Sequence, residues 1–283
     1  MSERRALFQH DGLPVRVADA AVPHVAWRWA RRGGIVGALV ALIALAPARW
    51  LASAVGHLTQ HRLQWLDAEG TVWQGSARWV LQPANAHPGA PAGLALPDRV
   101  QWRVRPQGPA GLSIALRAAC CMAQPLQLLA QPVWSGVALT VVDGRSDWPL
   151  SWLPGLGAPW NTLQPQGRLH VQTEGLRWRW QAGRGHLDGL ARLDLREVGT
   201  RLSTLRPLGD YRVEVRGGDT IQFTLSTLDG ALRLTGQGQW RERLDFSGEA
   251  SSDPEHEATL SNLLSVLGQR QGARATLKIG SGT

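Results

Sequence analysis

Hydrophobic and polar residues alternate along most of the chain from about residue 70 onwards, which is the pattern of half-buried β-strands. In the segment VQWRVR, for example, Val100, Trp102 and Val104 share one face, and polar residues occupy the other. Turn residues separate such segments about every 8–12 residues, an interval typical of antiparallel architecture. The pattern predicts a mainly β fold with a curved, mostly antiparallel sheet, arranged as a sandwich or a half-pipe.

The last third of the chain is the most regular part of this pattern. Four strands with short turns are expected over residues 209–218, 219–230, 231–240 and 241–250. Their apolar positions have two interpretations: an ordinary covered core, which is favoured, or the lining of an apolar trough in an open sheet. These positions are Val213, Val215, Ile221, Phe223, Leu225, Leu232, Leu234 and Phe246.

One short helix is expected after this meander. Asp253 is a candidate N-cap, Pro254 suits the first helical position, and Gly268 is a stop signal. Leucines at positions 260, 263, 264 and 267 fall on one helical face. This face should lie on the sheet or close its edge, before a final strand.

The N-terminal region carries the strongest hydrophobic signal. Residues Gly33 to Ala48 are 16 uncharged residues, and Arg28, Arg31 and Arg32 precede them. By the positive-inside rule, this arrangement predicts a cytoplasmic tail (1–32), a transmembrane anchor (33–55) and a periplasmic β domain (56–283). A buried core helix and a cleaved signal peptide ending at Ala54 are the alternatives; the uncleaved anchor is favoured.

Composition and charge exclude some classes of protein. The chain has 283 residues, 43% of them hydrophobic, so it is long and apolar enough for a folded core. The net charge of +8 is spread along the chain instead of forming a basic patch, which argues against nucleic-acid binding. Cys120 and Cys121 are adjacent; two small buried residues at a strand end are favoured over a vicinal disulfide, because strand neighbours point to opposite faces.

No motif with catalytic spacing is found. His57 and His61 stand at i and i+4, a spacing that can bind a metal, but no third ligand is nearby. We therefore expect no catalytic residue, no metal and no cofactor, and expect that the protein is not an enzyme.

The segment GTVWQG at residues 70–75 follows a short amphipathic stretch. We expect it to open the first strand of the exported sheet, because SARWVL continues with strand-like alternation. Trp73 should then lie inside, between the sheet and the segment ending near Leu66, and Gly75 should permit close packing opposite the ring. A related pattern, VWSGVALTV, recurs at residues 133–141.

The order of these features resembles the protein N family of type II secretion systems. The resemblance rests on AEGTVWQGSA at 68–77, VQWRVRP at 100–106 and the C-terminal NLLSVLGQRQGARATLKIG. Its most specific part is the motif formed by Gly70, Thr71, Val72, Trp73 and Gly75.

The resemblance implies a non-enzymatic accessory component of the secretion apparatus. It would be anchored in the inner membrane of a Gram-negative bacterium, with most of the chain in the periplasm. Its partners would be other secretion components of the inner-membrane platform or the secretin-linked complex. The meander also resembles envelope lipid-transfer proteins of the AsmA type, so lipid binding in an apolar trough is the alternative function.

Overall fold

The computed structural model describes residues 24–83, 93–108, 110–157 and 160–280. The chain divides into two compact units, Met1–Ala44 and Leu45–Thr283. Of the expected cytoplasmic tail, residues 1–23 lie outside the described residues.

Helix α1 (His24–Ala44) belongs to the first unit. Its large apolar side chains are exposed to solvent, among them Ile35, Leu39 and Ile43. Of the helices in the described part of the chain, none has both the length and the hydropathy that a membrane crossing requires.

The single helix expected over residues 33–55 is in fact two helices. Helix α1 ends at Ala44, and α2 (Ala48–Leu58) begins after a break that contains Pro47. Pro47 has no N–H and favours extended backbone at the residue before it, which explains the break. Ala48 is buried in the second unit, so α2 is part of the β domain instead of the continuation of an anchor.

The second unit is built on one antiparallel sheet. Its order is β1-β2-β4-β5-β6-β7-β9-β10-β11-β12-β13-β14-β16-β15, with β3 added beside β2 and β8 beside β9. The strands are β1 (Leu63–Gly70), β2 (Gln74–Leu81), β3 (Leu94–Ala95), β4 (Val100–Gln107), β5 (Gly111–Arg117), β6 (Leu126–Val133), β7 (Gly136–Val141), β8 (Gly144–Pro149), β9 (Gln166–Gln181), β10 (Arg184–Gly199), β11 (Gly209–Gly218), β12 (Ile221–Asp229), β13 (Leu232–Trp240), β14 (Leu244–Ser252), β15 (Gln269–Gln271) and β16 (Arg274–Ile279).

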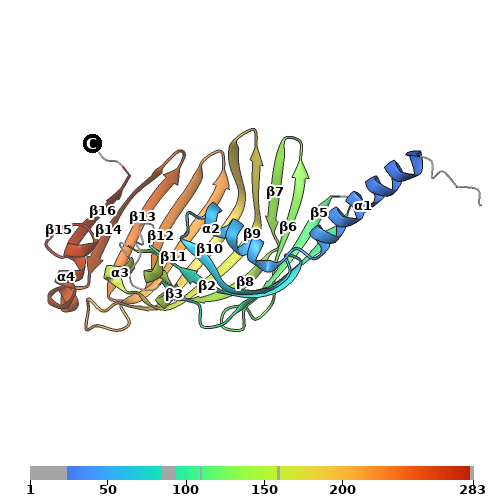
Figure 1. Ribbon diagram of the computed structural model, residues 1–283. Helices are drawn as coiled ribbons and strands as arrows, with labels where there is room; N and C mark the ends of the chain where they lie inside the picture. The colour runs from blue at the N-terminus through green and yellow to red at the C-terminus, as the bar shows by residue number, and fades with distance from the viewer. Residues whose placement is uncertain (1–23, 84–92, 109, 158–159, 281–283) are drawn as a thin grey trace, which may run out of the picture. The chain divides into compact units, whose positions relative to one another are not determined.

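The sheet is curved and open (Figure 1). This confirms the expected mainly β, antiparallel architecture, and the meander in the last third appears as β11 to β14. The sandwich alternative is wrong for the described residues, because all of their strands join one sheet whose ends, β1 and β15, do not pair with each other.

The expected C-terminal helix is present. A short 3-10 turn, η2 (Pro254–His256), follows Asp253, and α4 (Glu257–Leu267) ends before Gly268. Leu260, Leu263 and Leu264 of α4 are buried against Leu232 and other residues of the sheet. Helix α4 therefore covers one end of the apolar sheet face, as its leucine spacing predicts.

A second cluster of buried residues lies where the first strands meet β8 and the 3-10 helix after it, η1 (Leu150–Leu156). The short helix α3 (Trp160–Leu163) follows η1, and its Leu163 packs against the cluster beneath α4. Val100 of β4 is fully buried in the second cluster, and Trp148 of β8 and Trp152 of η1 pack against the same cluster. The sheet thus curves so that the apolar sides of β4 and β8 meet.

Candidate interaction surface

The apolar positions predicted in the last third share one face of the sheet. Directly opposite residues of antiparallel strands lie on the same face, and Val213 pairs with Leu225 and Val215 with Phe223. On the neighbouring strands, Ile221 pairs with Trp240, Leu234 with Ala250, and Phe246 with Gly238. These residues lie on the same side of the sheet as Val213 and Leu225. We call this side the apolar face.

The apolar face is only partly covered. Leu232 is buried beneath α4, whereas Val213, Val215, Ile221, Phe223, Leu225, Leu234 and Phe246 are half-buried. The described strands form one sheet, so no second sheet lies over them. The exposure of these side chains lies between that of a covered core and that of a free surface. A row of such apolar side chains can contact an apolar partner.

The apolar face continues onto β10 and β9, because Leu193 of β10 pairs with both Val213 and Val171 of β9. Other apolar pairs lie farther along the sheet: Leu128 of β6 pairs with Val141 of β7, and Leu139 of β7 pairs with Trp178 of β9. A register shift between Leu187 and Leu190 of β10 separates these pairs from the apolar face. The alternation of the sequence indicates each strand's apolar side, but only the register decides which of these sides join.

Three glycines make room for an aromatic ring on this face. A Cβ atom at Gly236 would lie 2.4 Å from the Phe246 ring, and one at Gly238 would lie 2.9 Å from it. At Gly248 the corresponding distance is 3.2 Å. The glycines of β13 and β14 therefore allow Phe246 to lie across the strands; the sequence shows these glycines but not their neighbour.

The opposite face carries a network of ion pairs on β10 and β11. Arg212 donates to both carboxylate oxygens of Asp194, at 2.6 and 2.7 Å. Arg196 bridges Asp210 (2.9 Å) and Asp194 (3.4 Å), and Arg192 pairs with Glu214. The two faces of these strands thus differ sharply in polarity.

The network shifts the acid–base behaviour of its members. Hydrogen bonds from Arg212 lower the pKa of Asp194, although burial acts in the opposite direction. For Asp210, burial raises the pKa, but hydrogen bonds from Arg196 and from the Glu197 N–H outweigh it and lower the pKa overall. Both carboxylates are therefore held charged, as suits a structural network.

The segment Gly70–Gly75 spans the turn between β1 and β2. As expected, it opens a strand, since β2 begins at Gln74 and continues through SARWVL, but β1 precedes it, so this is not the first strand of the sheet. Within it, the Thr71 N–H donates to the Gln74 carbonyl at 2.8 Å, and the Gln74 N–H donates to the Thr71 hydroxyl at 3.2 Å. The Val72 N–H donates to the Ala46 carbonyl at 2.9 Å. The bond from Val72 joins the turn to the segment that enters α2. The alternation of the sequence does not reveal this contact between distant parts of the chain.

Trp102 of β4 lies against this turn. Its indole N–H donates to the carbonyls of Thr71 and Val72, both at 3.2 Å. A Cβ atom at Gly75 would lie 2.5 Å from the Trp102 ring, so glycine leaves the necessary room. The ring that we expected from Trp73 is supplied by Trp102, while Trp73 itself is half-buried.

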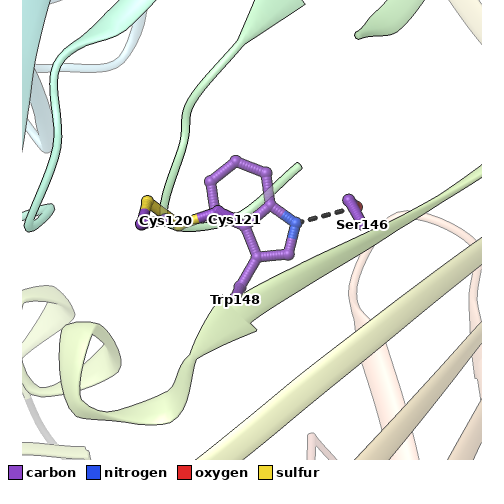
Figure 2. The surroundings of a disulfide bond; sticks show 4 residues. All are labelled: Cys120, Cys121, Ser146 and Trp148. Carbon is purple, nitrogen blue, oxygen red and sulfur yellow. Dashed lines mark hydrogen bonds between the residues drawn. A yellow bond between two sulfur atoms is a disulfide. The ribbon is translucent and has the colours of Figure 1, made fainter. Parts of the chain in front are cut away.

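Cys120 and Cys121 form a vicinal disulfide, the interpretation that sequence analysis did not favour. The reason is their place in the connection between β5 and β6, where strand geometry does not separate their side chains. Figure 2 shows Trp148 beside this disulfide, with its indole N–H donating to the Ser146 hydroxyl at 2.9 Å. The Asp147 N–H donates to the Cys121 carbonyl at 2.7 Å, which joins the loop to β8.

The remaining candidates for chemistry are few. The rings of His57 and His61 contact each other edge to face at 5.4 Å between centroids. Within the described residues, no group of three or more His, Cys, Asp and Glu side chains is arranged to hold a metal ion. His170 and Asp147 form a hydrogen-bonded pair whose side chains are both about half exposed.

The family comparison agrees with the resemblance seen in the sequence. The family described as type II secretion system (T2SS), protein N matches residues 61–277, a stretch that includes the β1–β2 turn, the disulfide and α4. No curated protein and no solved structure matches the chain. Because the match covers well over half of the sequence, the chain belongs to the type II secretion system protein N family.

Proposed function

We propose that this chain is a non-enzymatic component of the inner-membrane side of a type II secretion system, which docks or stabilises other parts of the assembly. The family match carries the assignment to the secretion system. The docking role is supported by the open sheet, because an unpaired edge strand presents backbone donors and acceptors to another chain.

The two edges of the sheet are unequally suited to docking. In β1 the register shifts between Leu66 and Glu69, and Asp67 adopts a positive φ of 52°, so a bulge interrupts this edge. At the other end, β15 covers only Arg274–Thr276 of β16. We therefore place the docking site at the β15–β16 edge, where strand addition meets no bulge.

The location in the envelope is part of the same proposal. A disulfide between Cys120 and Cys121 suits the oxidising periplasm. The exposed apolar side chains of α1, which follow Arg31 and Arg32, suit attachment of this helix to the inner membrane. Alkaline carbonate extraction tests the attachment; release of the full-length chain into the soluble fraction would contradict it.

The docking site is tested by site-specific photo-crosslinking in intact cells. A photo-reactive residue in place of Gln271, on the β15 edge, should capture other secretion components, identified by mass spectrometry. The matched control is Gln222, which is also exposed but lies in the interior of the sheet on β12. Equal capture from both positions, or capture from neither, would refute docking at this edge.

A second function is supported by the half-buried apolar face. In an open sheet, seven neighbouring apolar side chains offer a trough for acyl chains. The residues are those predicted from the sequence: Val213, Val215, Ile221, Phe223, Leu225, Leu234 and Phe246, with Leu232 beneath α4 at the end of the row.

Lipid extraction from the purified full-length protein tests the trough. We expect Phe223→Gln to lower the amount of co-purifying lipid several-fold, because a polar group then faces the acyl chain. Gln222→Ala, its neighbour on the opposite face, should leave the amount unchanged. Absence of lipid from the unsubstituted protein, or equal loss in both variants, would reject this function.

A further inference from the structure

Four hairpins end along one edge of the sheet. Because β6 to β14 are antiparallel, the β6–β7, β9–β10, β11–β12 and β13–β14 turns all lie at the same ends of their strands, and they form the upper edge in Figure 1. We call this edge the hairpin rim and define it by residues 134–137, 178–185, 216–221 and 240–244.

The hairpin rim exposes large aromatic side chains. Trp134, in the β6–β7 turn, is 94% exposed; Trp180 and Trp240 are 49% and 46% exposed. Trp178 and Val137 are also exposed. Trp180 pairs directly with Val137, and Trp240 pairs with Ile221 at the end of the apolar face.

Trp134 is more exposed than the tryptophan of the related segment earlier in the chain. The related segments at 72–80 and 133–141 both contain a hairpin turn followed by a strand. In the first, Trp73 is half-buried and its carbonyl accepts a hydrogen bond from the Val104 N–H at 2.6 Å. In the second, the equivalent Trp134 is exposed, and so are Val137 and Trp180 on the adjoining strands. Neighbouring exposed apolar residues of this kind indicate a contact surface.

Arginines lie among these aromatic residues. Arg184, Arg216, Arg241 and Arg243 are exposed on the rim, against two acidic residues, Asp219 and Glu242. Arg184, Arg241 and Arg243 form no ion pair with any described residue. The rim therefore combines excess positive charge with indole rings.

We propose that the hairpin rim docks on the surface of a bilayer that contains anionic phospholipid. Indole rings favour the headgroup level of a membrane, where the ring is in an apolar layer and the N–H is wet. Arginines next to them attract anionic headgroups.

The spacing of the tryptophans favours a lipid surface over a folded protein partner. Five strand spacings separate β7 from β13, so the rim residues extend over about 24 Å, measured along the edge of the sheet. Protein interfaces concentrate their aromatic residues in a central patch, and polar residues around this patch exclude water from it. On this rim Trp240 stands apart from the group of Trp134, Trp178 and Trp180, and arginines lie between and beside them. This distribution matches a planar layer of headgroups, which indole rings can enter at separate points.

Photo-crosslinking of the full-length protein on vesicles tests this proposal independently of α1. The substitution Trp134→p-benzoylphenylalanine puts the probe on the rim; Leu228→p-benzoylphenylalanine puts it at an exposed position at the opposite end of β12. On vesicles of phosphatidylcholine and phosphatidylglycerol, we expect lipid adducts from position 134 and few from position 228. Both sites are exposed, so thermal unfolding should match that of the unsubstituted chain.

A second measurement tests the role of charge. Combined Arg184→Gln, Arg241→Gln and Arg243→Gln should lower the yield of lipid adducts from position 134 at least tenfold, because each arginine near an anionic surface contributes about fivefold to binding. Vesicles of phosphatidylcholine alone should show a similar drop. The proposal is overturned by equal adduct yields at both positions, by adducts only with a second copy of the chain, or by no effect of the three substitutions.

Discussion

Replacing Trp102 by alanine is expected to lower the free energy of unfolding by about 3–5 kcal/mol. The Trp102 side chain is 2% exposed, and its ring lies 5.0 Å from Trp65, which stacks on Trp79 at 5.3 Å. The substitution leaves a cavity in this cluster and also removes the indole N–H that binds the β1–β2 turn. Chemical denaturation followed by circular dichroism measures the loss.

Trp73→Ala is the matched comparison for Trp102→Ala. Trp73 lies in the turn that Trp102 contacts, but its side chain is only half-buried. We therefore expect a smaller loss, about 1 kcal/mol. If Trp73→Ala costs as much as Trp102→Ala, the assignment of Trp102 as the residue that holds this turn is incorrect.

Leu264→Ala should lower the free energy of unfolding by about 2–5 kcal/mol. Leu264 is fully buried in the cluster that joins α4 to Leu232, Ala250 and Ala275 of three strands. Truncation opens a cavity where the helix covers the end of the sheet, and the surrounding strands cannot close it fully. The same denaturation experiment on the full-length protein measures this loss.

Val266 offers a control on the same helix. Its side chain is 52% exposed, so Val266→Ala should change stability by no more than about 0.5 kcal/mol. A large loss from Val266→Ala, or a negligible one from Leu264→Ala, would show that α4 does not pack on the sheet as described.

Elements whose signals are local could be predicted closely. The expected strand over 209–218 has the bounds of β11, because alternation and flanking turn residues define it. The leucine spacing predicted the face of α4 that packs on the sheet, on which Leu260, Leu263 and Leu264 are buried and Leu267 is half-buried. The trough positions also fall on one face, since each strand's own alternation predicts its apolar side.

Elements that depend on distant contacts could not be predicted. A helix over 33–55 agrees with hydropathy, but Pro47 and the packing of Ala48 against Ala77 divide it. The alternation in the GTVWQG segment predicts a strand, but residues 71–73 form a turn, which contacts Trp102 some thirty residues later. The vicinal disulfide depends on a loop conformation that the sequence pattern does not describe.

By itself, the sequence determined the β class, the C-terminal helix, the apolar side of each strand and the family, because periodicity, turn chemistry and motifs are local properties. Only the tertiary structure decided that the strands form one open sheet, that α2 joins this sheet, and that exposed tryptophans of three hairpins lie along one edge. These features require residues that are far apart in the chain to meet, and register and curvature arise from their packing.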